Sequence, residues 1–114
     1  MGIRSDVGLA IKRDAYVSLD LVQFGKIKDI IDKADSCEEN DSGFLFVWWD
    51  IKWYHKTYNE IMSLYEVLEQ LQLDDFIVIE ACPEDPSNTS ADRGSWHANP
   101  WNLRKYTTCS LEIG

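Results

Sequence analysis

Histidines, cysteines and neighbouring carboxylates are the residues of this 114-residue sequence that could do chemistry. His55 stands between Tyr54 and Lys56, just after a strongly apolar run. A histidine acts as a general base when it lies within reach of its partner groups, and Asp50 is one candidate acid. Strand alternation puts positions 50 and 55 on opposite sides, so we interpret His55 as a turn residue.

Metal binding is the second chemistry that these residue types allow. Cys82, His97 and Cys109 could form a ligand set, but their spacing matches no familiar zinc pattern. The acidic pairs at 74–75 and 84–85 could hold a hard cation, yet they lack the alternating acids and the glycine of a calcium loop. We therefore predict neither a metal site nor a catalytic residue.

Motifs for nucleotide binding or hydrolysis are missing from the sequence, which has no glycine-rich dinucleotide fingerprint, P-loop, HExxH, GxSxG or CxxC. Three cysteines, an odd number without close spacing, are typical of reduced thiols rather than of a disulfide framework. We predict that the protein is not an enzyme and binds no cofactor.

Length and composition are typical of one globular domain, spanning residues 1–114. A hydrophobic share of 45% and an aromatic share of 12% argue against disorder. No apolar run reaches the roughly 20 residues needed to cross a bilayer. The opening MGIRSDVGLAIKRD lacks the apolar stretch of a secretory signal. We expect a cytoplasmic protein without a membrane partner.

Charge is distributed unevenly along the chain, whose net charge is −9. Residues 1–28 and 93–114 each carry a net charge of +2, whereas residues 29–92 hold sixteen acids against three bases, a net charge of −13. No Lys or Arg occurs between Thr57 and Asp92. Such a centre repels nucleic acid and attracts basic grooves on proteins.

Hydrophobic periodicity in the first third predicts a strand and a helix. Val7, Leu9 and Ile11 alternate with small residues, which indicates a strand covered on both faces. A short turn at 14–19 precedes a helix that Asp20 caps, with Gln23 at the third helical position. The apolar face of that helix consists of Phe24, Ile27, Ile30, Ile31 and Ala34. The polar stretch 35–43 is interpreted as a loop.

The remaining residues predict three strands and a second helix. The strongest strand is 44–53, and Thr57 with Glu60 forms a capping box before a helix. The apolar face of this helix consists of Tyr58, Ile61, Met62, Tyr65, Leu68 and Leu71. A strand at 76–82, a long loop at 83–102 and a last strand at 106–113 follow. The order β-α-β-α-β-β predicts an α+β fold, with two helices on one face of a small four-stranded, mainly antiparallel sheet.

Alternation divides the stretch FVWWDIKWY into two sets of side chains. One set is entirely apolar and is expected to face the helices: Leu45, Val47, Trp49, Ile51 and Trp53. The other set runs from apolar to charged, as on a partly covered sheet face: Phe44, Phe46, Trp48, Asp50 and Lys52. Trp48 and Asp50 could therefore meet a partner, unless loop 83–102 packs over Trp48.

Two further tryptophans, Trp96 and Trp101, flank Pro100 in the long loop. Aromatic side chains of this kind dominate protein interfaces. Equally, they could close the open face of the sheet as a lid. Stacking of nucleic-acid bases on tryptophan is a third use, but the acidic centre opposes it because backbone affinity depends on cations.

Two segments resemble small proteins that phages and prophages encode. They are MGIRSDVGLAIKRDAY at the start and WDIKWYHKTYNEIMSLYEVLEQL followed by FIVIE, so the resemblance covers residues 1–16 and 44–80. Phage accessory genes include small acidic inhibitors of host defence, among them anti-CRISPR proteins and DNA mimics. The resemblance therefore implies a host-defence context rather than an activity that any residue could carry.

These observations favour a stoichiometric inhibitor that binds a host nucleic-acid-handling protein, such as a CRISPR effector, through an acidic surface resembling nucleic acid. The alternative is a non-catalytic structural or interaction module that self-associates through its sheet edge or the Trp48 face, for instance as a homodimer. The candidate contact residues are Glu38, Glu39, Asp41, Trp48, Asp50, Glu66, Glu69, Asp74, Asp75, Glu84, Asp85, Trp96 and Trp101.

Overall fold

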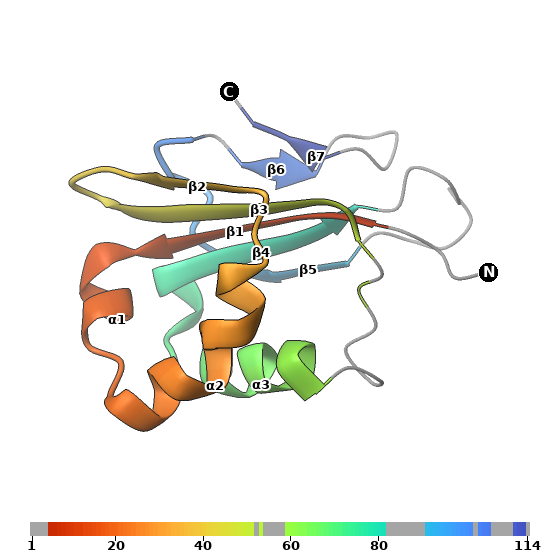
Figure 1. The fold of residues 1–114 in the computed structure, drawn as a ribbon. Helices are drawn as coiled ribbons and strands as arrows, with labels where there is room; N and C mark the ends of the chain where they lie inside the picture. The colour runs from red at the N-terminus through yellow and green to blue at the C-terminus, as the bar shows by residue number, and fades with distance from the viewer. Residues whose placement is uncertain are drawn as a thin grey trace.

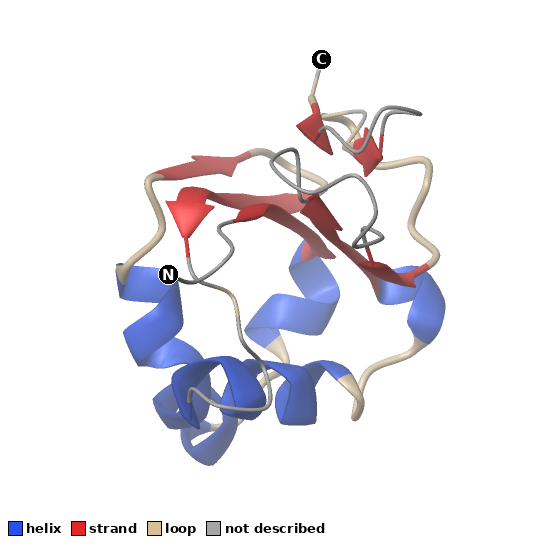
Figure 2. Ribbon diagram, turned by 90° about the vertical axis from the view of Figure 1, so that its right-hand side faces the viewer, coloured by secondary structure: helices blue, strands red, loops and turns tan. Residues whose placement is uncertain are grey.

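The computed structural model describes residues 5–51, 53, 59–81, 91–101, 103–105 and 111–113. It has an α+β fold in which the helices cover one face of a five-stranded antiparallel sheet, with strand order β2-β3-β1-β4-β5 (Figure 1). A two-stranded sheet, β6-β7, lies over the other face (Figure 2). The elements are β1 Ser5–Lys12, α1 Arg13–Val17, α2 Leu21–Asp32, β2 Ser36–Glu39, β3 Gly43–Ile51, α3 Asn59–Leu68, the 3₁₀ turn η1 Leu73–Asp75, β4 Phe76–Ala81, β5 Ala91–Gly94, β6 Arg104–Lys105 and β7 Leu111–Glu112.

The first strand, β1, lies at the centre of the sheet between β3 and β4. Val7, Leu9 and Ile11 pack against the helices, while Ala10 is buried on the opposite face. The prediction of a strand covered on both faces is therefore confirmed.

Both N-terminal helices follow the sequence pattern. The short α1 forms at the predicted turn and ends before Ser18. Asp20 Oδ1 accepts a hydrogen bond from the Gln23 N–H at 2.8 Å, and Gln23 Oε1 accepts one from the Asp20 N–H at 2.9 Å. Ile27 and Ile30 of α2 are buried, as predicted. Among the described residues, the longest apolar helical stretch is too short to cross a membrane.

Helix α3 packs beside α2 and has the predicted amphipathic character. Ile61, Tyr65 and Leu68 are buried, but Met62 is 38% exposed, because the apolar face is centred closer to Leu64. Thr57, the first residue of the predicted capping box, lies outside the described residues.

Two segments differ from the predicted element order, and a third is described only in part. The polar stretch 35–43 contains β2, which pairs with β3 through a tight hairpin. The predicted loop 83–102 contains β5, which pairs with β4. Of the predicted last strand, the structure describes only β7 and residue 113. The sheet gains these edge strands because β3 and β4 would otherwise leave a row of backbone groups without partners.

From Phe44 to Trp48, the orientation of β3 is opposite to the one that we predicted. Phe46 and Trp48 pack in the core beneath the helices. Ile51 and Trp53, which follow the shift in strand register, lie on the helix side as predicted. Leu45 and Val47 instead pack on the other face of the sheet. The predicted inward position of Trp49 is wrong as well, since 47% of its surface is exposed.

The second face of the sheet carries a core of its own. Leu45, Ile77 and Ile79 are covered there by Trp96 and Leu103 from the C-terminal segment. This face is therefore covered over the Leu45 core but open at Trp49, which is 47% exposed, and the alternative that segment 83–102 covers the sheet is confirmed for its described part. What it covers is the Leu45 side, since Trp48 lies on the helix side.

Candidate binding surface

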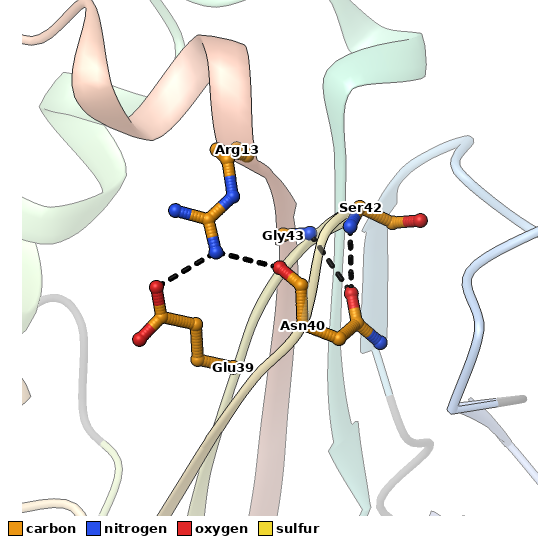
Figure 3. A network of polar contacts seen from close by, with 5 residues as sticks. All are labelled: Arg13, Glu39, Asn40, Ser42 and Gly43. Atoms are coloured by element: carbon orange, nitrogen blue, oxygen red, sulfur yellow. Dashed lines mark hydrogen bonds and ion pairs between the residues drawn. The ribbon is translucent and has the colours of Figure 1, made fainter.

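The hairpin between β2 and β3 is a polar turn organised by Asn40 and Arg13 (Figure 3). Asn40 Oδ1 accepts hydrogen bonds from the backbone N–H groups of Ser42 at 2.8 Å and Gly43 at 3.1 Å. The Arg13 guanidinium donates to the Glu39 carboxylate at 2.7 Å and to the Asn40 carbonyl oxygen at 2.6 Å. Asparagine favours such turns because its side chain replaces a backbone acceptor. The charge of Glu39 is therefore balanced within the hairpin.

Glu38 and Asp41, on either side of this network, are exposed. Neither takes part in an ion pair with another described residue. Between Lys33 and Lys52 the chain has no basic residue, although Lys12 and Arg13 line the same pocket as Asp41. Both carboxylates are accessible to a partner, and their binding to a basic one stays a prediction.

The acids of α3 are arranged differently from the expected open acidic face. Glu66 lies 3.7 Å from the Lys26 ammonium, and Glu69 lies 3.1 Å from the Arg93 guanidinium. All four side chains are largely exposed, so each pair contributes little to stability. The pairs nevertheless reduce the negative charge that Glu66 and Glu69 offer to a partner.

Asp74 and Asp75 lie in η1, immediately before β4. Asp74 is exposed and Asp75 is partly exposed, and neither forms an ion pair with another described residue. The strand register pairs Glu39 with Phe44, Phe44 with Ile11, and Ile11 with Phe76. This row places the β2–β3 turn and η1 at one end of the sheet, roughly 15 Å apart across three strand spacings. Asp41 and Asp74 can therefore contact one extended partner.

Asp50 lies at the opposite end of the sheet, away from the other described acids of the predicted set. Its backbone φ is +52°, and its N–H donates to Asp6 Oδ1 at 2.9 Å. The strand pairing shifts here, because Val7 pairs with Trp48 but Ser5 pairs with Ile51. Asp50 is therefore part of a β-bulge, in which an aspartate tolerates positive φ better than most residues.

The predicted tryptophan contacts are mostly buried. Trp48 has no exposed surface, and its indole N–H donates to the Ile30 carbonyl oxygen at 2.9 Å. The interpretation of Trp48 as a partner-facing residue is therefore wrong. Trp96 is 8% exposed and contacts the partly buried Trp101 ring edge-to-face at 6.3 Å. Both belong to the lid, the segment around residues 96–103 that covers the second face of the sheet.

Asn99 holds this lid in place. It is 5% exposed, its side-chain amide donates to the Trp96 carbonyl oxygen at 2.9 Å, and its Oδ1 accepts from the Leu103 N–H at 2.8 Å. A buried polar side chain with satisfied hydrogen bonds fixes the local backbone. Trp96 and Trp101, which stand on either side of Asn99 in the sequence, were the available signal for a structured lid.

Trp49 is the aromatic residue that sequence reasoning missed as a candidate contact. It is 47% exposed, and its N–H donates to Asp35 Oδ2 at 2.6 Å. It precedes the bulge, so alternation from Val47 places it on the second face of the sheet. It therefore lies beside Asp35, just before strand β2, where a partner could cover it.

A buried polar contact lies beneath the helices around Tyr65. The Tyr65 hydroxyl accepts a hydrogen bond from Trp53 Nε1 at 3.1 Å. Burial raises the pKa of Tyr65, and the nearby Glu80 carboxylate raises it further. The Arg93 guanidinium lies over the Tyr65 ring, 5.2 Å from its centroid. The Tyr65 phenol therefore stays neutral at ordinary pH and joins α3 to the Trp53 side chain.

The residues that first suggested chemistry are not brought together in the described part of the chain. His97 is exposed in the lid, and Cys37 is exposed on β2. No group of three His, Cys, Asp or Glu side chains suited to a metal occurs among the residues that the structure describes. His55, Cys82, Glu84, Asp85 and Cys109 lie outside them.

Comparison with known proteins gives no match, whether with family models, with curated proteins or with solved structures.

Proposed function

We propose that this protein is a stoichiometric inhibitor of the type that phages encode, and that it acts in the host cytoplasm. Its target would be a host nucleic-acid-handling protein, such as a CRISPR effector, whose basic groove accepts the acidic surface in place of DNA or RNA. The observation that carries the proposal is the acidic end of the sheet, where Glu38, Asp41 and Asp74 are exposed without a described ion-pair partner.

Charge determines which partner suits this surface. The chain carries a net charge of −9, so nucleic acid is repelled while a lysine- and arginine-lined groove is attracted over a distance. Such attraction speeds association and fades as salt screens it. The contact set is also revised, because Trp48 is buried, whereas Trp49, beside Asp35, is exposed.

The competing function is a self-associating module. Self-association through the Trp48 face loses support because that side chain is buried. Self-association through the sheet edge stays open to test because strand β2 is exposed. Sedimentation distinguishes the two functions. A dimer that persists at high salt and displaces no nucleic acid from any partner would favour the module.

The test begins with capture of partners from a nuclease-treated bacterial lysate. A captured nucleic-acid-binding protein is then titrated with the full chain while its labelled DNA or RNA is followed by anisotropy. We expect complete displacement near one chain per partner. Glu38→Lys/Asp41→Lys should weaken displacement at least tenfold at low salt, and less at high salt.

The matched control is Asp29→Lys/Asp32→Lys on α2, which makes the same change in net charge on another surface. This double variant should displace nucleic acid nearly as well as the unchanged protein. Equal weakening by both double variants, or failure of the unchanged protein to displace nucleic acid, would overturn the proposal.

A further inference from the structure

Strand β2 forms one edge of the five-stranded sheet, and β3 is its only pairing partner among the residues that the structure describes. Its register with β3 is Ser36 with Val47, Cys37 with Phe46, Glu38 with Leu45, and Glu39 with Phe44. All four β2 residues are exposed. An edge of this kind offers a row of backbone N–H and C=O groups to another strand.

Alternation identifies which backbone groups are open. The Asn40 N–H donates to the Gly43 carbonyl oxygen at 3.0 Å, so position 40 forms a hydrogen-bonded pair with β3. In an antiparallel ladder such pairs recur at every second residue, which makes 38 and 36 the next ones. The N–H and C=O groups of Cys37 and Glu39 therefore point away from β3, toward the open side.

The charge of the edge argues against a second copy of this chain. Residues 35–41 include four acids and no base. Antiparallel pairing of two copies through the open groups would bring these acids onto facing strands, and like charges across strands are destabilising. A partner strand with positive charge would gain from the same arrangement.

The two faces of β2 favour different side chains on a partner strand. Glu39 shares the helix side with Phe44, and Arg13 already balances its charge at 2.7 Å. Glu38 shares the other side with Leu45, where it has no described ion-pair partner and where Trp49 is exposed. One cation on that side can meet the Glu38 carboxylate, and a second, about 13 Å along the strand, can approach the exposed Trp49 ring.

We propose that the β2 edge binds an extended segment of a partner protein as a sixth, antiparallel strand. The segment carries Lys or Arg at every second position, facing Glu38 and Trp49, and neutral residues facing Cys37 and Glu39. This inference rests on the proposed function, because it names how the basic partner is held. Backbone hydrogen bonds supply affinity, and the alternating charge supplies specificity.

A seven-residue peptide, acetyl-Thr-Lys-Thr-Lys-Thr-Lys-Thr-amide, is the probe. Backbone NMR of the full chain should show shifts centred on residues 36–40, and exchange of the Cys37 and Glu39 amides should slow about tenfold. The Glu38 amide, already paired with β3, serves as the internal control. N-methylation of the threonines removes the donors that face β2 and should weaken binding at least tenfold, whereas N-methylation of the lysines should be tolerated.

Protein variants provide the second arm. Cys37→Pro removes one open N–H and should abolish protection at Glu39, while Cys37→Ala should bind normally. Glu38→Lys should weaken peptide binding at least tenfold, and Asp29→Lys should leave it unchanged. Unaffected binding of the N-methyl-threonine peptide would overturn the proposal. So would a concentration-dependent dimer that protects Cys37 and Glu39 without any peptide.

The two proposals fail in different ways. If nucleic-acid displacement is lost in Glu38→Lys/Asp41→Lys but the peptide protects neither amide, strand addition is wrong and the proposed function stands. If the peptide protects both amides but the unchanged protein displaces no nucleic acid from any captured partner, the proposed function is wrong and the edge site stands.

Discussion

The indole nitrogen of Trp48 and the carbonyl oxygen of Ile30 are joined by a hydrogen bond of 2.9 Å, entirely inside the core. The bond attaches strand β3 to the last turns of α2. It also explains how a tryptophan can be fully buried, since its one polar group has a partner.

Trp48→Phe removes this hydrogen bond and leaves a cavity beneath the helices. We expect the free energy of unfolding to fall by about 2 kcal/mol or more, measured by urea denaturation. Trp49→Phe is the matched control, because that side chain is half exposed, and its effect should stay within about 0.5 kcal/mol. Similar losses for both variants would contradict the orientation of β3.

The Tyr65 pKa predicts a loss of stability at alkaline pH. Its pKa is raised above the ordinary value of 10.0, so the folded state favours the neutral phenol. The resulting stabilisation is complete below pH 10 and is lost as pH rises through the folded-state pKa. Tyr65→Phe should therefore flatten the decline in unfolding free energy above pH 10.

Tyr16→Phe is the comparison for this alkaline measurement, since burial also raises the pKa of Tyr16, helped by Cys37 and Asp32. Tyr16 is less buried than Tyr65, so Tyr16→Phe should flatten the curve less. A curve for Tyr65→Phe that runs parallel to that of the unchanged protein above pH 10 would exclude the proposed cause.

Gly25 and Gly94 should respond in opposite ways to alanine. A Cβ at Gly25 meets no atom within 4 Å, so Gly25→Ala in the middle of α2 should raise the free energy of unfolding by about 0.5–1 kcal/mol. Gly94 has a φ of +83°, and a Cβ there would lie 2.2 Å from the Phe76 carbonyl oxygen. Gly94→Ala should lower the melting temperature, and a rise would show that the β5 edge is built differently.

Asp20→Ala tests the capping box of α2. It removes the acceptor of the Gln23 N–H and should lower the free energy of unfolding by about 1 kcal/mol. Asp29→Ala, exposed near the other end of α2, should be neutral or slightly stabilising because an acid is unfavourable at a helix C-terminus. Thermal denaturation of the pair compares the two directly, and equal losses would argue against the cap.

Helix α2 could be predicted from sequence because its signals are local. Asp20, Gln23 and the 3.6-residue spacing of Ile27 and Ile30 need no knowledge of the rest of the chain. Strand β2 could not, because Cys37, Glu38 and their neighbours have little preference for a strand. These residues form a strand only because the hairpin places them beside β3, where they pair with its backbone.

The orientation of β3 was not predictable from its own residues. Every position from Phe44 to Trp49 is apolar, so alternation cannot show which side chains in that run face the helices. The register of β3 with β1 decides the orientation. Leu9 pairs with Phe46, and the large residues of β1 face the helices, so Phe46 faces them too. That register depends on contacts distant in sequence. The described acids of the predicted set are exposed or partly exposed, while Trp48 and Trp49 exchanged roles.

The central place of β1 governs how the chain can fold as it is made. The strand precedes both of its neighbours, β3 and β4, and other elements separate it from each of them along the chain. Pairing between such distant segments slows folding. A ribosome must therefore release residues up to Ala81 before β1 is bonded on both sides, and the apolar strand depends on the nascent chain staying unaggregated until then.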